Sequence, residues 1–360
     1  METIKLPFYA KASLTFIGLI SFVATLYFAQ SIIVPLIYAI ILATVLSPIV
    51  LFFERKKMNR VWAISISLLI VFLVLSLLAI LLSSQMSMFT ETLPKLLDKF
   101  TETLNRSVIW TSGRFDVQPK LINDAIAELK MNIIGYGKSS IGSTISSMGS
   151  ALVVLFLIPV YVFMILFYES LLLDFIRKLF GKNNQTEVND ILTSTKTIIQ
   201  KYLSALVLEA IIIATLNGIG LLIIGVDYAI VLAIMGAILN VVPYIGGILA
   251  VSFPIMVAIG TDSSSTTVLM IVGLYMVVQF VDNHYVVPKI VASKVRINAL
   301  ISIIVVLSGG ALWGLAGMFL SIPLTAIMKV IFDHIEGLKP WGFLLGDTMP
   351  TQRNKFKRVL

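Results

Sequence analysis

The sequence predicts an all-α polytopic membrane protein with about eight membrane segments, two of them re-entrant helical hairpins. Hydrophobic residues make up 58% of the 360 residues and charged residues only 13%, against roughly 25% charged in soluble domains. Apolar runs of about 20 residues, enough to span a hydrocarbon core, recur along the chain. Two longer apolar blocks, 228–260 and 299–335, carry glycines and prolines in their interior. Each block is too long for one span and too short for two, so the two blocks predict the hairpins.

The remaining apolar runs predict six single spans joined by polar or charged segments. Polar residues 83–147 predict a helical extracytoplasmic segment, and the apolar helical face of residues 186–202 predicts an amphipathic cytoplasmic helix. The single spans are expected at residues 13–29, 33–53, 61–82, 148–168, 203–224 and 267–287. The chain is therefore divided into a scaffold of three spans (1–82), the extracytoplasmic segment (83–147), a fourth span with the cytoplasmic helix (148–202), a transport core (203–335) and a basic tail (336–360).

Basic residues predict how this series of spans is oriented, since loops rich in Lys and Arg stay in the cytoplasm. The loop FERKKMNR, which ends at Arg60, is expected inside, and both termini are then cytoplasmic as well. The later basic loop KIVASKVRIN falls inside only if block 228–260 enters the membrane and returns to the outer face. The same reasoning predicts that block 299–335 is a hairpin entering from the cytoplasm.

The residues within the two blocks favour a break at mid-depth. Backbone groups freed by a break cannot face lipid and must be buried in protein or line an aqueous cavity. A plain proline kink satisfied by neighbouring helices is the alternative. Each hairpin follows one span and the two enter from opposite sides, which predicts an inverted repeat typical of a secondary transporter. The residues at the breaks are Pro243, Gly246, Gly247, Gly309, Gly310, Gly314 and Gly317.

Three stretches carry a resemblance to a known family. PYIGG, QFVDNHYVVPKI and GGALWGLAGMFLSIPLTAIMKVI resemble the autoinducer-2 exporter family. The family pattern in the last single span maps onto Gln279, Asp282, Asn283 and Pro288, with Asp where Glu is more usual. The resemblance implies export of autoinducer-2 or a related small molecule, a bacterial inner-membrane location and a homo-oligomer, namely a pentamer. Some members are described as sodium–proton antiporters, so the resemblance leaves the substrate open.

Polar residues inside the spans are the candidates for a translocation site. Glu209 and Asp282 are the candidates for proton or ion coupling. A polyhydroxylated solute would need amide and hydroxyl partners, whereas an antiporter would need a carboxylate, and both sets of groups are present. Asn217 and Ser308 are further polar residues near the breaks. The translocation site is expected to comprise Asn240, Pro243, Gly246, Gly247, Gln279, Asp282, Asn283, Gly309, Gly310, Gly314 and Gly317.

Several classes of function are excluded or disfavoured. The chain has no Cys and only 2 His, so disulfides and thiol chemistry are excluded and a His-rich metal site is disfavoured. No phosphate-binding loop of the Walker type is present, and we expect neither an enzyme nor a cofactor. The net charge is +8, and most Lys and Arg residues lie in short segments that flank spans. This distribution favours anionic lipid over nucleic acid as the partner. The sequence thus predicts a secondary transporter that exports a small polar molecule, such as autoinducer-2, by alternating access. A monovalent cation/proton antiporter and a channel-like permease are the alternatives.

Overall fold

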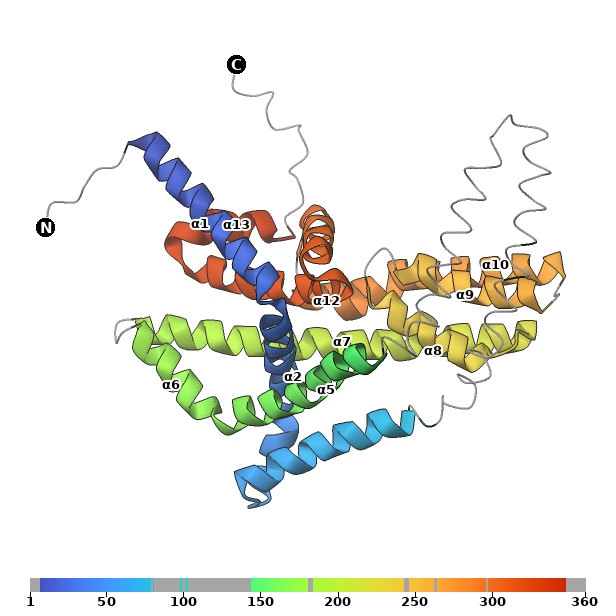
Figure 1. Cartoon of the computed structure of the whole chain (residues 1–360), viewed down its shortest axis with the longest axis horizontal. Helices are drawn as coiled ribbons and strands as arrows, with labels where there is room; N and C mark the ends of the chain where they lie inside the picture. Colours follow the sequence, from blue (N-terminus) through green and yellow to red (C-terminus); the bar gives the residue numbers. More distant parts are fainter. Residues whose placement is uncertain are drawn as a thin grey trace, which may run out of the picture. The chain divides into compact units, whose positions relative to one another are not determined.

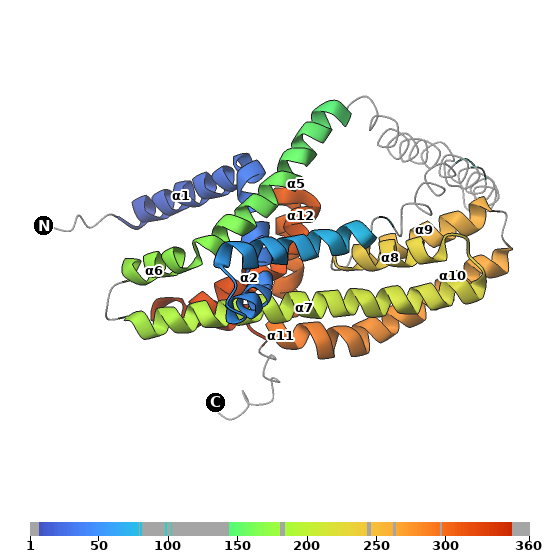
Figure 2. The ribbon, with the colours of Figure 1, turned by 90° about the horizontal axis from the view of Figure 1, so that it is seen from below.

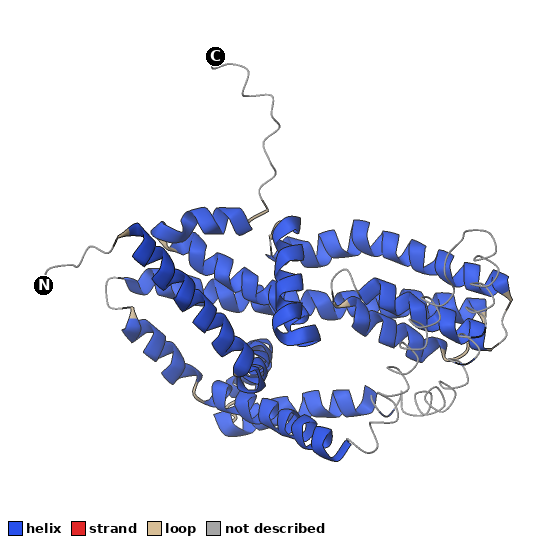
Figure 3. Cartoon of the chain, turned by 45° about the horizontal axis from the view of Figure 1, so that its top comes forward, coloured by secondary structure: helices blue, strands red, loops and turns tan. Residues whose placement is uncertain are grey.

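The computed structural model describes residues 7–78, 80, 98, 102, 144–180, 184–242, 246–261, 264–295 and 297–347. Most of the expected extracytoplasmic segment, and Pro243, lie outside these residues. All regular secondary structure in the described residues is helical (Figure 3). The chain divides into two compact units, which are described separately. Unit 1 comprises Met1–Ser47, Leu157–Thr195 and Ile297–Leu360, and unit 2 comprises Pro48–Phe156 and Lys196–Arg296.

Each expected single span coincides with a helix. Among the described residues, six helices are long and apolar enough to cross a membrane, and the bent pair Phe156–Phe167 with Glu169–Leu179 is a seventh candidate. Many large apolar side chains on these helices are exposed, as contact with lipid requires. The protein is therefore an all-α, multi-pass membrane protein, which confirms the predicted class. The helices that coincide with the expected single spans are α1 (Phe8–Phe28), α2 (Gln30–Arg55), Arg60–Leu78, α5 (Thr144–Phe167), α7 (Gln185–Ile224) and α10 (Ser265–Val281).

Helix α7 joins the expected cytoplasmic helix and the fifth span without a break (Figure 1). Its 40 residues correspond to about 60 Å at 1.5 Å per residue, about twice the thickness of a hydrocarbon core. The helix ends at Gly225, whose φ is +82°. There the Gly225 and Val226 amides both donate to the Leu221 carbonyl. Glycine adopts this left-handed conformation without steric cost, which explains why the helix ends here.

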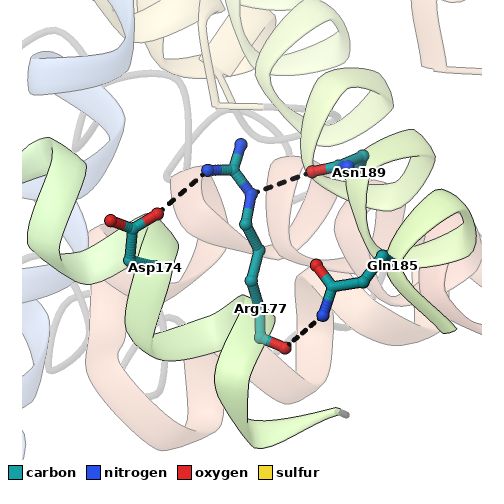
Figure 4. Close-up of polar contacts among 4 residues, drawn as sticks. All are labelled: Asp174, Arg177, Gln185 and Asn189. Carbon is teal, nitrogen blue, oxygen red and sulfur yellow. Dashed lines mark hydrogen bonds and ion pairs between the residues drawn. The ribbon is translucent and has the colours of Figure 1, made fainter. Parts of the chain in front are cut away.

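Arg177 holds the corner between α6 (Glu169–Leu179) and the start of α7 (Figure 4). Its Nη1 donates to Asp174 Oδ1 at 3.1 Å, and its Nε donates to Asn189 Oδ1 at 3.0 Å. Gln185 Nε2 donates to the Arg177 carbonyl at 2.7 Å, and this carbonyl belongs to the last turn of α6, where helical acceptors are otherwise unpaired. One arginine thus links the end of α6 to the first turns of α7.

In unit 2, α8 (Ala229–Asn240), α9 (Gly246–Gly260), α10 and the second half of α7 share one hydrophobic core (Figures 1 and 2). Its fully buried members include Leu221, Leu232, Val257 and Ile271, one from each of these helices. Small residues bring the helices close together. A Cβ at Gly236 would lie 3.4 Å from the Ala250 Cβ, and such pairs of small residues are typical of helix contacts in membranes.

In unit 1, α12 (Ala299–His334) is broken in its middle and doubles back. Trp313 has φ −134° and ψ 19°, and Gly314 has φ 60° and ψ −142°, a combination open essentially to glycine alone. Both ends of α12 reach the short helix α13 (Lys339–Leu345). Asn298, which caps the first end, donates through Nδ2 to the Leu344 carbonyl at 2.7 Å, whereas Gly342 packs against Asp333 near the second end. The two limbs of α12 therefore form a helical hairpin whose base is closed by α13.

The break in α12 is anchored to the first two helices of the same unit. Trp313 Nε1 donates to the Leu26 carbonyl at 3.0 Å, and the Tyr38 hydroxyl donates to the Ala316 carbonyl at 3.4 Å. The Tyr38 ring also stacks on Phe319, with centroids 5.8 Å apart. Leu26 lies at the end of α1, where carbonyls lack helical donors. One tryptophan thus serves an orphan carbonyl and positions the turn of the hairpin.

Candidate functional site

Asp282 is the centre of a buried polar cluster in unit 2. It follows the last residue of α10 and is 2% exposed. Asn240, at the end of α8, donates from Nδ2 to Asp282 Oδ2 at 2.9 Å. The other carboxylate oxygen, Oδ1, is buried without a hydrogen-bond partner in the described structure. A carboxyl group held in this way within apolar helices is costly and is by default a functional candidate.

The break between α8 and α9 brings backbone and amide groups to the same place. A Cβ at Gly246 would collide with the Leu239 carbonyl, so only glycine fits where the chain turns. A Cβ at Gly247 would lie 2.6 Å from Gln279 Oε1 and 3.6 Å from Asn240 Oδ1. The start of α9 therefore packs against two amide side chains, one on α8 and one on α10. Hence the structure brings together four of the predicted site residues with Asp282.

Helix α7 contributes a second carboxyl group. Glu209 is 7% exposed, and the Glu209 and Asp282 carboxyls are close enough to interact electrostatically. Tyr202, two turns earlier on α7, is 4% exposed and lies within electrostatic range of Glu209. The two predicted coupling residues thus lie in one electrostatic environment, although they are 73 positions apart in the sequence.

A small pocket adjoins this cluster. Its polar lining consists of Asn217, Asn240, Tyr275 and Gln279. The remaining lining residues come from α7, α8, α9 and α10. The interior has room for about one water molecule. Asn217 and Tyr275 are 2% and 8% exposed, and Asn217 Oδ1 and the Tyr275 hydroxyl have no hydrogen-bond partner in the described structure. The pocket therefore offers polar groups whose hydrogen bonds remain to be made.

The helix that carries Asp282 changes its geometry at this residue. Asp282–Ala292 forms a π-helix that contains Pro288, and π-helical segments are rare and frequent at functional sites. Asn283, the next predicted site residue, is exposed, and its Oδ1 accepts a hydrogen bond from Gln279 Nε2 at 3.4 Å. Asn283 therefore lies at the edge of the cluster rather than within it.

The predicted glycines of the second hairpin belong to unit 1 and have structural roles there. Gly314 forms the turn, and Gly309 and Gly317 lie back to back, since a Cβ on either would collide with the backbone carbonyl of the other. A Cβ at Gly310 would lie 2.6 Å from the Met318 Cε. These contacts account for each glycine locally. Their part in translocation stays a prediction, as does that of Pro243, which lies outside the described residues.

Two of the polar residues that line the pocket, Asn217 and Tyr275, were not among the predicted site residues. Tyr275 was overlooked, and Asn217 was considered only as a polar residue near the breaks. A helical pattern could have identified both. Tyr275, Gln279 and Asp282 recur at spacings of four and three on one face, and Glu209 and Asn217 are eight residues apart on α7. As for metals, no group of three or more His, Cys, Asp or Glu side chains suited to an ion occurs in the part of the chain that the structure describes.

Long apolar helices with a buried polar cluster between them are typical of multi-pass, α-helical membrane transporters. The family model for AI-2E family transporters matches residues 16–337, and the chain belongs to this family, as its motifs predicted. It is 25% identical to YhhT of Escherichia coli (strain K12) over 345 residues, 93% of this chain and 94% of YhhT. Over 340 residues it is 26% identical to YueF of Bacillus subtilis (strain 168), 91% and 89% of the two chains. AI-2 transport protein TqsA of Escherichia coli (strain K12) is 25% identical over 327 residues, 89% and 91% of the two chains.

Proposed function

We propose that the protein is a secondary transporter that exports a small polar solute, such as autoinducer-2, by alternating access. The observation that carries this proposal is the cluster of Asp282, Asn240 and Gln279 at the break between α8 and α9. Polar side chains in such an apolar surrounding cost free energy unless they serve a ligand or one another. The full-length similarity to TqsA, whose name specifies AI-2 transport, supports the choice of solute.

The transport test uses purified protein in liposomes loaded with autoinducer-2 and no ion gradient. We expect efflux above that of protein-free liposomes. Gly247→Ala sharpens this test, because the new methyl group displaces the flexible end of Gln279 rather than backbone, and we expect slower efflux from a folded protein. Gly273→Ala is the matched control, since a Cβ there meets nothing within 4 Å. Absence of efflux from wild-type liposomes would contradict the proposed solute.

A monovalent cation/proton antiporter is the second candidate, and the proximity of Glu209 to Asp282 favours it. Two carboxyl groups that interact electrostatically in an apolar core can exchange a proton for a cation. Either the proton or the cation neutralises the negative charge that burial disfavours. A Na⁺ gradient imposed on liposomes that contain a pH-sensitive dye distinguishes the two candidates. Proton flux that follows Na⁺ supports antiport, whereas solute efflux without a pH change supports export. Solute flux that never saturates would instead indicate a channel-like permease.

The proposal includes an orientation in the bacterial inner membrane with both termini in the cytoplasm. The chain has no Cys, so single introduced cysteines report sidedness without background. If α8–α9 enters and returns on the outer face, Asp227→Cys and Ser264→Cys both react with an impermeant maleimide from outside. Lys294→Cys and Glu336→Cys should react only after the membrane is opened. Labelling of Asp227→Cys and Ser264→Cys from opposite sides would overturn the re-entrant arrangement.

A further inference from the structure

Two buried polar groups without hydrogen-bond partners among the described residues lie beside the proposed solute site. The Asn217 side-chain oxygen on α7 and the Tyr275 hydroxyl on α10 are both without a hydrogen-bond partner in the described structure. Both residues are more than nine-tenths buried. Burial without a partner costs free energy, so a buried polar group of this kind calls for a ligand or a water molecule.

The two groups face one space rather than two. Both residues line the same pocket, together with the amides of Asn240 and Gln279. The pocket holds about one water molecule, which is also about the volume of a single hydroxyl group. Gly236 on α8 lies beside the tyrosine, since a Cβ there would be in van der Waals contact with its hydroxyl at 3.4 Å.

The chemistry of the two groups defines what fits between them. An amide oxygen accepts a hydrogen bond, and a tyrosine hydroxyl both donates and accepts. An alcohol or a water molecule can donate to Asn217 and accept from Tyr275, so one such group satisfies both residues. No charged side chain lines the pocket, and an anionic group would therefore lack a counter-charge.

We propose that Asn217 and Tyr275 form an inner subsite for one hydroxyl group of the transported solute. A water molecule occupies the subsite when the solute is absent. This inference rests on the proposed function, because it assigns the solute to the neighbouring amides of Asn240 and Gln279. It adds a specificity: the transporter distinguishes a hydroxylated solute from the same solute without that hydroxyl.

The first test measures efflux from liposomes over a range of concentrations, with autoinducer-2 and with a deoxy analogue that lacks one hydroxyl. Tyr275→Phe removes only the subsite hydroxyl. We expect it to raise the KM for autoinducer-2 about tenfold, the effect of one lost hydrogen bond. The KM for the deoxy analogue that lacks the hydroxyl bound in the subsite should be unchanged. Tyr285→Phe is the matched control, because Tyr285 follows on the same chain segment and is 54% exposed. An unchanged KM for autoinducer-2 in Tyr275→Phe would overturn the subsite.

The second test is independent of the solute. An experimental structure of the full chain in lipid nanodiscs, without solute, should show ordered density about 3 Å from both Asn217 Oδ1 and the Tyr275 hydroxyl. The same density should be lost in Tyr275→Phe. An empty pocket in the wild type would refute the subsite, even if the protein exports autoinducer-2. Conversely, bound density in a protein that moves no autoinducer-2 would support the subsite and refute the proposed solute.

Discussion

The break between α8 and α9 and the break inside α12 solve the same backbone problem in different surroundings. In unit 2, the turn ends beside the amides of Asn240 and Gln279 and the carboxyl group of Asp282. In unit 1, the turn is formed by Trp313 and Gly314 and is held by an indole N–H that serves a helix-end carbonyl. Buried polar oxygens near the first break have no hydrogen-bond partner in the described structure, whereas at the second break Trp313 and the Ala316 carbonyl both form hydrogen bonds within the unit.

This difference teaches that a broken helix is not by itself a binding site. Freed backbone groups must be satisfied in both hairpins, because lipid offers no hydrogen bonds. Only in unit 2 does the described structure add a buried carboxylate and a pocket with unpaired groups. We therefore expect substitutions at the first break to change transport, and substitutions at the second to change mainly stability.

The largest effect is expected from Asp282→Asn. The amide can still accept the hydrogen bond from Asn240, so the fold should survive, but the charge is lost. Transport should fall to the level of protein-free liposomes, because an intramembrane carboxylate is retained at considerable cost. Asp227→Asn, in the exposed turn before α8, should transport like the wild type. Wild-type transport by Asp282→Asn at several pH values would contradict a role in coupling.

Next in size is Gly314→Ala, which tests the backbone of the second break. Alanine at φ 60° and ψ −142° is strained, and the free energy of unfolding should fall by about 1–3 kcal/mol. Gly273→Ala, in open space on α10, should instead raise it by about 0.5–1 kcal/mol. Unfolding midpoints in mixed micelles provide the measurement. Equal midpoints for the two variants would show that Gly314 is not the turn.

Two substitutions of Asn298 distinguish its helix cap on α12 from its hydrogen bonds to the end of α13. Asn298→Ala removes both the helix cap and the side-chain hydrogen bonds to the Leu344 and Gly346 carbonyls at the end of α13, and should cost about 1–2 kcal/mol. Asn298→Asp keeps an oxygen for the Ile301 amide, now at 2.9 Å, but loses the donors to the Leu344 and Gly346 carbonyls. Its loss of stability should be intermediate. If Asn298→Asp matched the wild type in thermal unfolding, the hydrogen bonds from Asn298 to the Leu344 and Gly346 carbonyls would contribute nothing to stability.

The smallest effect is expected from Trp313→Phe, which removes the indole N–H and keeps an aromatic ring. The Leu26 carbonyl loses its donor, and the free energy of unfolding should fall by about 1 kcal/mol. Trp341→Phe, on α13 and 59% exposed, is the control and should be neutral. A change in solute efflux by Trp313→Phe at unaltered stability would break the distinction between the two hairpins.

The sequence by itself determined the class and the order of the helices, and it identified most of the residues that meet in the candidate site. Composition and run length suffice for the class, because continuous apolar runs of about 20 residues have the length and composition of helices that span a hydrocarbon core. The glycines in the two long apolar blocks predicted both breaks. Asp282, Glu209, Asn240 and Gln279 were predicted as site residues because they are polar residues within apolar runs. Span boundaries were displaced by a few residues, because the end of an apolar run does not fix the last residue of a helix.

Only the tertiary structure decided which of these residues meet. The distance between Asn240 and Asp282 depends on how α8 packs on α9 and α10, which involves contacts between residues far apart in the chain. Packing within each unit also gives Gly246 and Gly309 different neighbours, although both belong to similar glycine motifs. Tyr275 became a candidate because its hydroxyl is buried without a partner. A sequence records that a tyrosine is present, but the satisfaction of its hydroxyl is a property of the atoms that surround it.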